Sequence, residues 1–281
     1  KGAENTTVSL TILREDGTII KKDLTRKAFS MPNVETKILY GNTGYISLNS
    51  FSNDTASLVS KAIRDLKNKG AKSFIFDLQN NGGGYVTAAE QLIGMFPNAI
   101  YAYKITEATG TSNVRAIKQS STFPVDTKLL INKFSASSSE MTAAALSDQK
   151  SAILYGQATY GKGSMQAFYE LEDGSFLKLT VGHFYGPNGT KINEVGVKPN
   201  IQTVSNPLFK AHYDTIASNL NNYKEISALK NISLDKTFKI NFSNNLAKTI
   251  DTASIELVEL GGNIVETSFK VSGRQLLVTP K

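Results

Sequence analysis

Two short segments of the sequence combine residue types that can cleave an acyl bond. Ser137 lies in the block Ser135–Glu140 (SASSSE), between an expected strand and an Ala-rich helix. A serine at such a junction can expose its hydroxyl, and the N–H groups after it point at the carbonyl under attack. Lys162 stands between Gly161 and Gly163, and small neighbours leave space for its amine to reach inward. The two segments therefore supply a candidate nucleophile and a candidate base.

Each of these segments, taken alone, has a simpler interpretation. Serine is a favoured N-cap residue, so a serine of the 135–140 block can merely begin the helix. The Gly-Lys-Gly segment also fits a basic turn between two strands. Either segment by itself favours the structural role over the catalytic one.

A third segment, Asp77–Gly84 (DLQNNGGG), follows an expected buried strand and precedes a helix. Its three glycines allow positive φ angles and close approach of the backbone to a ligand. Backbone N–H groups exposed there can bind an anion or a developing oxyanion. An ordinary strand-to-helix turn explains the segment equally well. Phosphate and dinucleotide binding are disfavoured because the spacing matches neither GxxxxGK[ST] nor GxGxxG.

The composition excludes several classes of site. The 281 residues include no cysteine, which rules out disulfides, a cysteine nucleophile and thiolate metal ligands. Only His183 and His212 are available to a histidine-rich metal centre. The net charge of +7 comes from scattered lysines without a dense basic run. We therefore expect no nucleic-acid partner and favour association with an anionic cell wall or membrane surface.

Hydrophobic periodicity predicts alternating strands and helices. An apolar stripe closed by Gly70 predicts a helix over 54–70. Because the apolar strand 73–78 follows this helix, the pattern indicates a βαβ unit and a parallel sheet. Further helices are expected over 87–96 and 138–147, and strands over 7–13, 18–24, 38–48, 129–132, 152–156, 164–171 and 175–186.

These patterns divide the chain into four parts. Residues 1–33 contain a hairpin, 34–205 form one α/β domain, and 206–235 form a helical connector. Residues 236–281 carry short strands over 237–242, 254–259, 266–271 and 275–280. Short strands at regular spacing are typical of a β-sandwich module, although this part is too short for a complete one.

The order of five motifs resembles the C-terminal processing peptidases, also called tail-specific proteases. The family patterns are DLRxNxGG, SASASE, T-[FY]-GKG-x-x-Q, a late LT-strand and G-[IV]-x-P-[DN]. They correspond here to Asp77–Gly84, Ser135–Glu140, Thr159–Gln166, Leu179–Val181 and Gly196–Asn200. The resemblance covers about 34–201. It implies an α/β, ClpP/crotonase-like catalytic core built from ββα units, with a partial PDZ-like hairpin before it and a small all-β segment after it.

The resemblance implies roles for three side chains. Ser137 is the nucleophile, Lys162 is the general base, and Gln166 orients the lysine. The separation of 25 positions between serine and lysine (162 − 137) agrees with the family spacing. A lysine acts as a base only when its amine is neutral, and burial away from water favours that form. Gln166 would hold the amine without adding a charge.

The oxyanion hole that the resemblance implies consists of two backbone N–H groups, which we assign to Gly83 and Ser138. Gly82 and Gly84 stay open as alternatives to Gly83. Three positions depart from the family pattern, since Gln79 replaces an Arg, Ser138 replaces an Ala, and Gly82 often appears as Pro. None of these departures removes a reacting group.

The resemblance therefore implies a serine endopeptidase, without metal or cofactor, that cleaves proteins with apolar C-terminal tails through an acyl-enzyme. Residues 1–33 resemble the last part of a PDZ domain, which captures a substrate C-terminus in the family. Residues 236–281 resemble a bacterial Ig-like segment and indicate an extracellular or cell-envelope setting in a Gram-positive bacterium. The alternative is a catalytically silent ligand- or peptide-binding protein of the same fold at the cell surface.

Overall fold

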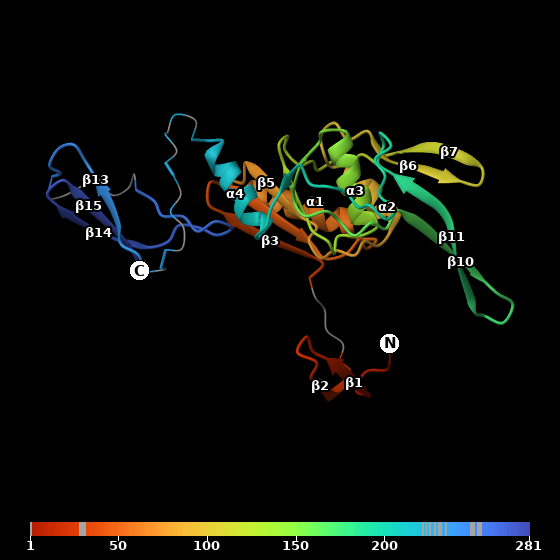
Figure 1. Cartoon of the computed structure of the whole chain (residues 1–281). Helices are drawn as coiled ribbons and strands as arrows, with labels where there is room; N and C mark the ends of the chain where they lie inside the picture. Colours follow the sequence, from red (N-terminus) through yellow and green to blue (C-terminus); the bar gives the residue numbers. More distant parts are fainter. Residues whose placement is uncertain are drawn as a thin grey trace. The chain divides into compact units, whose positions relative to one another are not determined.

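The computed structural model describes residues 2–27, 32–220, 222, 224, 226–227, 229, 232–233, 235–247, 251 and 255–281. The chain separates into two compact units, Lys1–Asn33 and Val34–Lys281 (Figure 1). The first unit contains β1 (Thr7–Leu13) and β2 (Ile19–Thr25), paired antiparallel. The predicted N-terminal hairpin is thus confirmed.

Six strands form the central sheet of the second unit, in the order β12-β9-β8-β5-β4-β3. All neighbours are parallel except β3 and β4, so the predicted parallel sheet is confirmed. The β-like run over 38–48 turns at Gly41 and Asn42, which both have positive φ, and its two halves belong to two strands. The strands are β3 (Val34–Leu39), β4 (Thr43–Leu48), β5 (Ser73–Asp77), β8 (Lys128–Ile131), β9 (Ile153–Gly156) and β12 (Ile201–Gln202).

Alternate residues of the parallel strands face two hydrophobic clusters, because side chains along a strand point to opposite faces. Phe74 and Phe76 of β5 belong to the larger cluster, which includes residues of α1, α2 and α3. Ile75 belongs to the smaller cluster with Ala211 of α4. Helices α1–α3 therefore cover one face and α4 the other. The helices are α1 (Thr55–Asn68), α2 (Val86–Ile93), α3 (Ser138–Asp148) and α4 (Pro207–Ala217). The three predicted helices of the core are confirmed.

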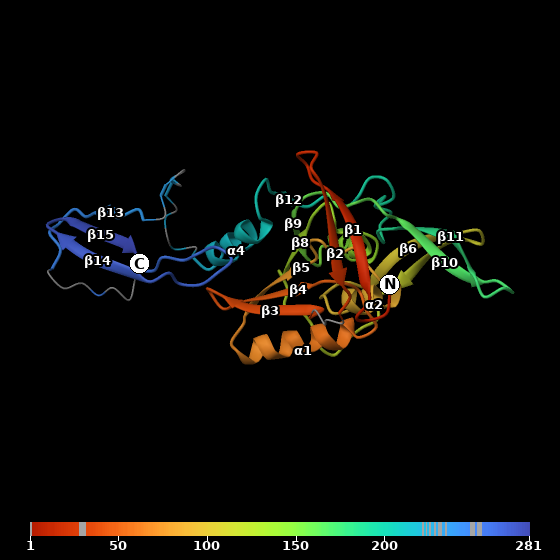
Figure 2. The ribbon, with the colours of Figure 1, turned by 90° about the horizontal axis from the view of Figure 1, so that it is seen from below.

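A second, antiparallel sheet has the order β10-β11-β6-β7. Figure 2 shows the β10–β11 hairpin projecting from the core. Strands β10 and β11 were predicted from the sequence, whereas β6 and β7 were not. The alternation of apolar Tyr103 and Ile105 with polar Lys104 and Thr106 is a strand signal that was overlooked. The strands are β6 (Tyr101–Glu107), β7 (Gly110–Arg115), β10 (Ser164–Glu170) and β11 (Phe176–Tyr185).

The C-terminal part forms a three-stranded antiparallel sheet in the order β13-β15-β14, with β13 (Phe238–Asn241), β14 (Thr267–Ser272) and β15 (Gln275–Pro280). Three of its four predicted strands are confirmed. The strand expected over 254–259 begins outside the described residues and contributes an isolated bridge between Val258 and Ile264. Within the described ranges, no helix has both the length and the apolar character to cross a bilayer.

Candidate active site

Ser137 occupies the N-cap position of α3. Its backbone angles are φ 57° and ψ −114°, whereas an ordinary N-cap residue has an extended conformation with negative φ. A positive φ costs a non-glycine residue on the order of 1–3 kcal/mol, so surrounding contacts must hold it in place. The helix-cap interpretation is therefore right about the position of Ser137 but does not explain its strained conformation.

The carboxylate of Glu140 provides those contacts. Glu140 is fully buried in the first turn of α3. Its Oε2 accepts hydrogen bonds from the Ser137 N–H at 2.9 Å and the Lys162 N–H at 2.7 Å. Its Oε1 accepts from the Gly161 N–H and the Thr159 hydroxyl, both at 2.6 Å. One carboxylate thus joins the serine segment 135–140 to the Gly-Lys-Gly segment 161–163.

Glu140 had no predicted role of its own beyond its place in the serine motif. The Ser-x-x-Glu spacing is a recognisable signal for a capping box, in which the glutamate bonds back to the N-cap amide. That signal predicts the bond to Ser137. It does not predict the bonds to Gly161 and Lys162, which lie more than 20 positions further along the sequence.

A cleft of about 330 Å³ lies beside these segments, and Ser137, Lys162 and Gln166 all line it. Gln166 is exposed, and Lys162 is half-buried. Among the described residues, no hydrogen bond joins Ser137 Oγ to Lys162 Nζ or the Gln166 side chain to Lys162. The other lining residues are Gly84, Val86, Met141, Ser164, Met165, Phe168, Lys178, Val181 and Phe184. The structure thus brings the three predicted catalytic side chains to one cleft, and their catalytic roles stay predictions.

Gly83 packs directly against Ser137. A Cβ atom at position 83 would lie 2.7 Å from Ala136 O and 2.8 Å from Ser137 Cβ, so no side chain fits there. The Gly83 N–H donates a hydrogen bond of 2.9 Å to Asn81 Oδ1. This amide, which we assigned to the oxyanion hole, already has a partner in this arrangement.

Ser138 ties the start of α3 to the glycine segment, because its hydroxyl donates a hydrogen bond of 2.9 Å to Gly84 O. The Ser138 N–H occupies the first position of the helix, where no carbonyl of the same helix can accept it. Of the three glycines over 82–84, Gly84 is the one that lines the cleft. Ser138 itself is buried and does not line the cleft. The oxyanion-hole role of Ser138 and the choice among Gly82, Gly83 and Gly84 therefore stay predictions.

The family model described as "Peptidase family S41" matches residues 42–203, which include all five motifs. The chain belongs to peptidase family S41. It is 33% identical over 274 residues to a "Probable CtpA-like serine protease" of Staphylococcus aureus (strain MRSA252), covering 95% of this chain and 52% of that protein. It is 36% identical over 162 residues to "Carboxyl-terminal-processing peptidase 3, chloroplastic" of Arabidopsis thaliana, covering 57% of this chain and 31% of that protein. The chain thus spans about half the length of its staphylococcal relative.

A solved structure described as "Photosystem II D1 C-terminal processing protease" is also similar, with a TM-score of 0.62 and 26% identity. The match covers 72% of this chain and 57% of that one. The resemblance to C-terminal processing peptidases and the α/β fold with a small all-β C-terminal segment are therefore confirmed. The PDZ-like and Ig-like interpretations stay predictions.

Asp77, the first residue of the glycine motif in this member of family S41, is buried and does not line the cleft. Its Oδ2 accepts from the Tyr45 hydroxyl and its Oδ1 from the Gln79 N–H, each at 2.7 Å. Burial raises the pKa of Asp77 to about 6, although both hydrogen bonds favour the charged form. Asp77 therefore supports the start of the glycine segment rather than the reacting atoms.

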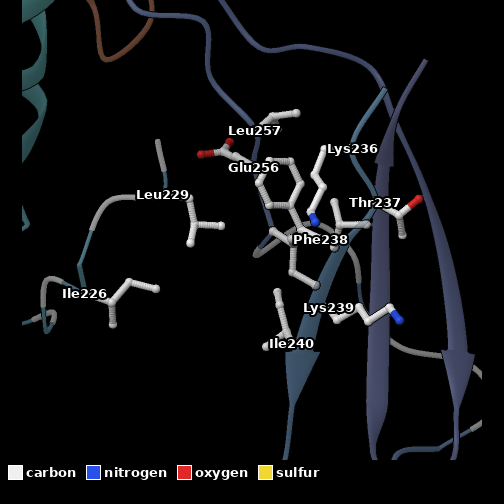
Figure 3. Close-up of a pocket in the computed structure, with 11 residues that line it drawn as sticks. Ile226, Leu229, Lys236, Thr237, Phe238, Lys239, Ile240, Glu256 and Leu257 are labelled. Carbon is white, nitrogen blue, oxygen red and sulfur yellow. The ribbon is translucent and has the colours of Figure 1, made fainter. Parts of the chain in front are cut away.

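A larger cavity of about 570 Å³ lies in the C-terminal part of the protein (Figure 3). Aliphatic and aromatic side chains dominate its wall, and none of the predicted catalytic residues reaches it. It is lined by Ile226, Leu229, Lys236, Thr237, Phe238, Lys239, Ile240, Ile255, Glu256, Leu257 and Val278.

Within the described part of the sequence, no group of three or more His, Asp or Glu side chains is placed to hold a metal ion.

Proposed function

We propose that this protein is a serine endopeptidase that cleaves protein substrates near their C-termini, with Ser137 as nucleophile and Lys162 as general base. The observation that carries the proposal is the Glu140 carboxylate, which binds the strained Ser137 backbone and the Lys162 backbone through a single oxygen atom. Strained residues that surrounding contacts hold in place cluster at active sites and ligand-binding sites. Membership of family S41 supports the same conclusion.

In the proposed reaction, the neutral Lys162 amine takes the proton of Ser137 Oγ while Oγ attacks the carbonyl carbon of the scissile peptide bond. The oxyanion accepts hydrogen bonds from the Ser138 N–H and from an N–H of the glycine segment, and each such donor contributes about 3–4 kcal/mol. The protonated lysine then donates its proton to the leaving amine, and the C–N bond breaks. Water, activated by the same lysine, hydrolyses the acyl-enzyme and restores Ser137.

The active form requires two adjustments from the arrangement described above. The Lys162 side chain turns within the cleft to reach Ser137 Oγ, and Gln166 then holds the amine by a hydrogen bond. A glycine amide must also face the oxyanion. Gly84 can serve from its place on the cleft wall, whereas Gly83 would first have to release Asn81.

We propose further that residues 1–33 are the last part of a PDZ domain that binds apolar C-terminal tails. Its hairpin exposes large apolar side chains, with Leu13 70% and Ile19 63% exposed. A lone two-stranded hairpin is marginally stable in water, so these side chains need an apolar partner surface.

For residues 236–281 we propose an Ig-like segment in an extracellular or cell-envelope setting of a bacterium. The net charge of +7 supports contact with anionic cell-wall or membrane surfaces.

The test of the proposed function is incubation with an unstructured protein that has an apolar C-terminal tail, followed by mass spectrometry. The unmodified protein should release C-terminal fragments, whereas Ser137→Ala and Lys162→Ala should release none and keep the same circular dichroism spectrum. Lys37→Ala, at an exposed position of β3, is the matched control and should cleave normally. Cleavage by Lys162→Ala would refute the Ser–Lys pair. If the unmodified protein cleaves nothing, the alternative of a catalytically silent peptide-binding protein replaces the proposed peptidase.

A further inference from the structure

One edge of β10 has no neighbouring strand in the described part of the protein. The strand begins at Ser164, two positions after Lys162, and its first residues line the cleft. Natural edge strands are usually short or protected by Pro, Lys or other charges. β10 spans seven residues (SMQAFYE), and Glu170 at its far end is its only charged residue. An edge of this length, with its one charge at the end far from the candidate active site, suits the addition of an extended peptide as a further strand.

The same cleft carries an uncompensated positive charge. Apart from the candidate base Lys162, Lys178 is the one ionisable residue among those that line it, and no carboxylate does. Lys178 lies opposite Phe168 in the β10–β11 pair, and its Nζ is 5.5 Å from the centre of the Phe168 ring. The described residues include no ion pair that involves Lys178. The aromatic ring therefore positions the lysine side chain while its charge stays available to a ligand.

We propose that Lys178 binds a carboxylate of the substrate while the substrate peptide lies along the free edge of β10. This inference rests on the proposed function, because it concerns the substrate of that same cleft. Ser164 and Phe168 are four positions apart on β10, which corresponds to about 13 Å in a strand that rises about 3.3 Å per residue. An extended substrate covers that distance with roughly four residues, which places the carboxylate roughly three to five residues from the scissile bond.

A substrate carboxylate has two sources, the α-carboxylate at the C-terminus and an Asp or Glu side chain. A C-terminal carboxylate bound at Lys178 would set the length of the removed tail. An Asp or Glu side chain bound there would instead select substrates that carry an acidic residue at that distance from the scissile bond. Both present the same charged oxygens to the lysine, so the experiment has to separate them.

The experiment measures peptide binding apart from cleavage. The full 281-residue protein with Ser137→Ala is titrated into a fluorescent apolar peptide, and the dissociation constant is read from fluorescence anisotropy. The peptide is made with a free C-terminal carboxylate, with a C-terminal amide, and with an amide plus a Glu four residues after the cleavage site. The affinity of each peptide is measured for the Ser137→Ala protein and for three double variants. These combine Ser137→Ala with Lys178→Met, with Lys178→Arg or with the control Lys37→Met.

We expect amidation to weaken binding about tenfold in the Ser137→Ala protein, the effect of one charge-assisted contact. Lys178→Met should remove this difference, while Lys178→Arg and Lys37→Met should keep it. Recovery by the Glu-containing amide shows that an acidic side chain can make the same contact, and no recovery confines the contact to the C-terminal carboxylate. Equal affinity for all three peptides, or a difference that survives Lys178→Met, would overturn the inference even if the unmodified protein is an active peptidase. Lys178-dependent binding without any cleavage would instead overturn the proposed peptidase function and leave the binding site standing.

Discussion

The backbone N–H of Lys162 donates a hydrogen bond of 2.7 Å to Glu140 Oε2, and the Ser137 N–H donates to the same oxygen at 2.9 Å. Both backbone segments therefore lie within hydrogen-bond distance of a single buried atom. Because the carboxylate accepts four hydrogen bonds in all, displacing either segment would remove at least one hydrogen bond from a buried charged group. Glu140 thus acts as a positioning residue for the candidate nucleophile and base.

We expect Glu140→Gln to lower both activity and stability. The side-chain amide retains one acceptor oxygen, but its NH2 group faces two donors and leaves them unpaired. Each unpaired buried donor costs about 1–3 kcal/mol, and a small shift of the reacting groups lowers kcat about 100-fold. Urea unfolding and peptide cleavage measure the two effects. Glu172→Gln, in the exposed turn of the β10–β11 hairpin, is the control and should match the unmodified protein in both assays.

Ser137→Gly and Ser137→Ala should both abolish cleavage but differ in stability. Glycine adopts a φ of 57° without the penalty that a Cβ atom brings, whereas alanine keeps the strain. The glycine variant should therefore be more stable than the alanine variant by about 1 kcal/mol, after allowance for the greater entropy of its unfolded state. Chemical denaturation of the two variants side by side measures this difference. A glycine variant no more stable than the alanine variant would show that the Ser137 backbone is not strained.

Gly83→Ala and Gly82→Ala form a matched pair of substitutions in one turn. At position 83, φ is 97° and the new Cβ would lie 2.8 Å from Ser137 Cβ, so we expect a loss of about 2 kcal/mol or more together with loss of activity. A Cβ at position 82 meets nothing within 4 Å. Gly82→Ala should therefore stay within about 0.5 kcal/mol of the parent protein. Similar thermal unfolding midpoints for both variants would contradict the close packing of Gly83 on Ser137.

Stability should fall as the pH drops below about 6.5 because of His212. Its Nδ1 accepts a hydrogen bond of 2.8 Å from the Gly261 N–H, and Nε2 lies 2.9 Å from Tyr40 O, which requires the neutral ring. Burial lowers the pKa of His212 from its ordinary value of 6.5, although the bond to Tyr40 opposes this. The unfolded state therefore takes up the proton first, and stability is lost as the pH falls from 6.5 towards the folded-state pKa.

Thermal unfolding midpoints between pH 8 and pH 5 test this prediction, with His212→Gln as the variant that cannot take up the proton. The variant should show a shallower decline over this range. Asp77 contributes with the opposite sign, because burial raises its pKa from 3.8 to about 6 and stability then falls as the pH rises through that window. Asp77→Asn in the same series separates the two contributions. An identical pH dependence in the His212 variant and the parent protein would count against the role of His212.

Much of the core was predictable because its signals are local. The apolar stripe that ends before Gly70 gives α1, and the apolar run before Asp77 gives the buried strand β5. β6 and β7 were missed because their signal is a weak alternation around Tyr103 rather than a continuous apolar run. The order of the motifs also sufficed to predict the peptidase family.

The sequence by itself determined the residue types of the candidate site, their order and the spacing of 25 positions between Ser137 and Lys162. Only the tertiary structure decided that Glu140 accepts hydrogen bonds from both backbone segments and that Asn81 accepts one from the Gly83 N–H. It also decided that Lys178 lines the same cleft as Ser137. The physical reason is that hydrophobic periodicity and turn propensity act over a few neighbouring residues. A hydrogen bond across 22 positions depends instead on where the folded backbone places its donor and acceptor.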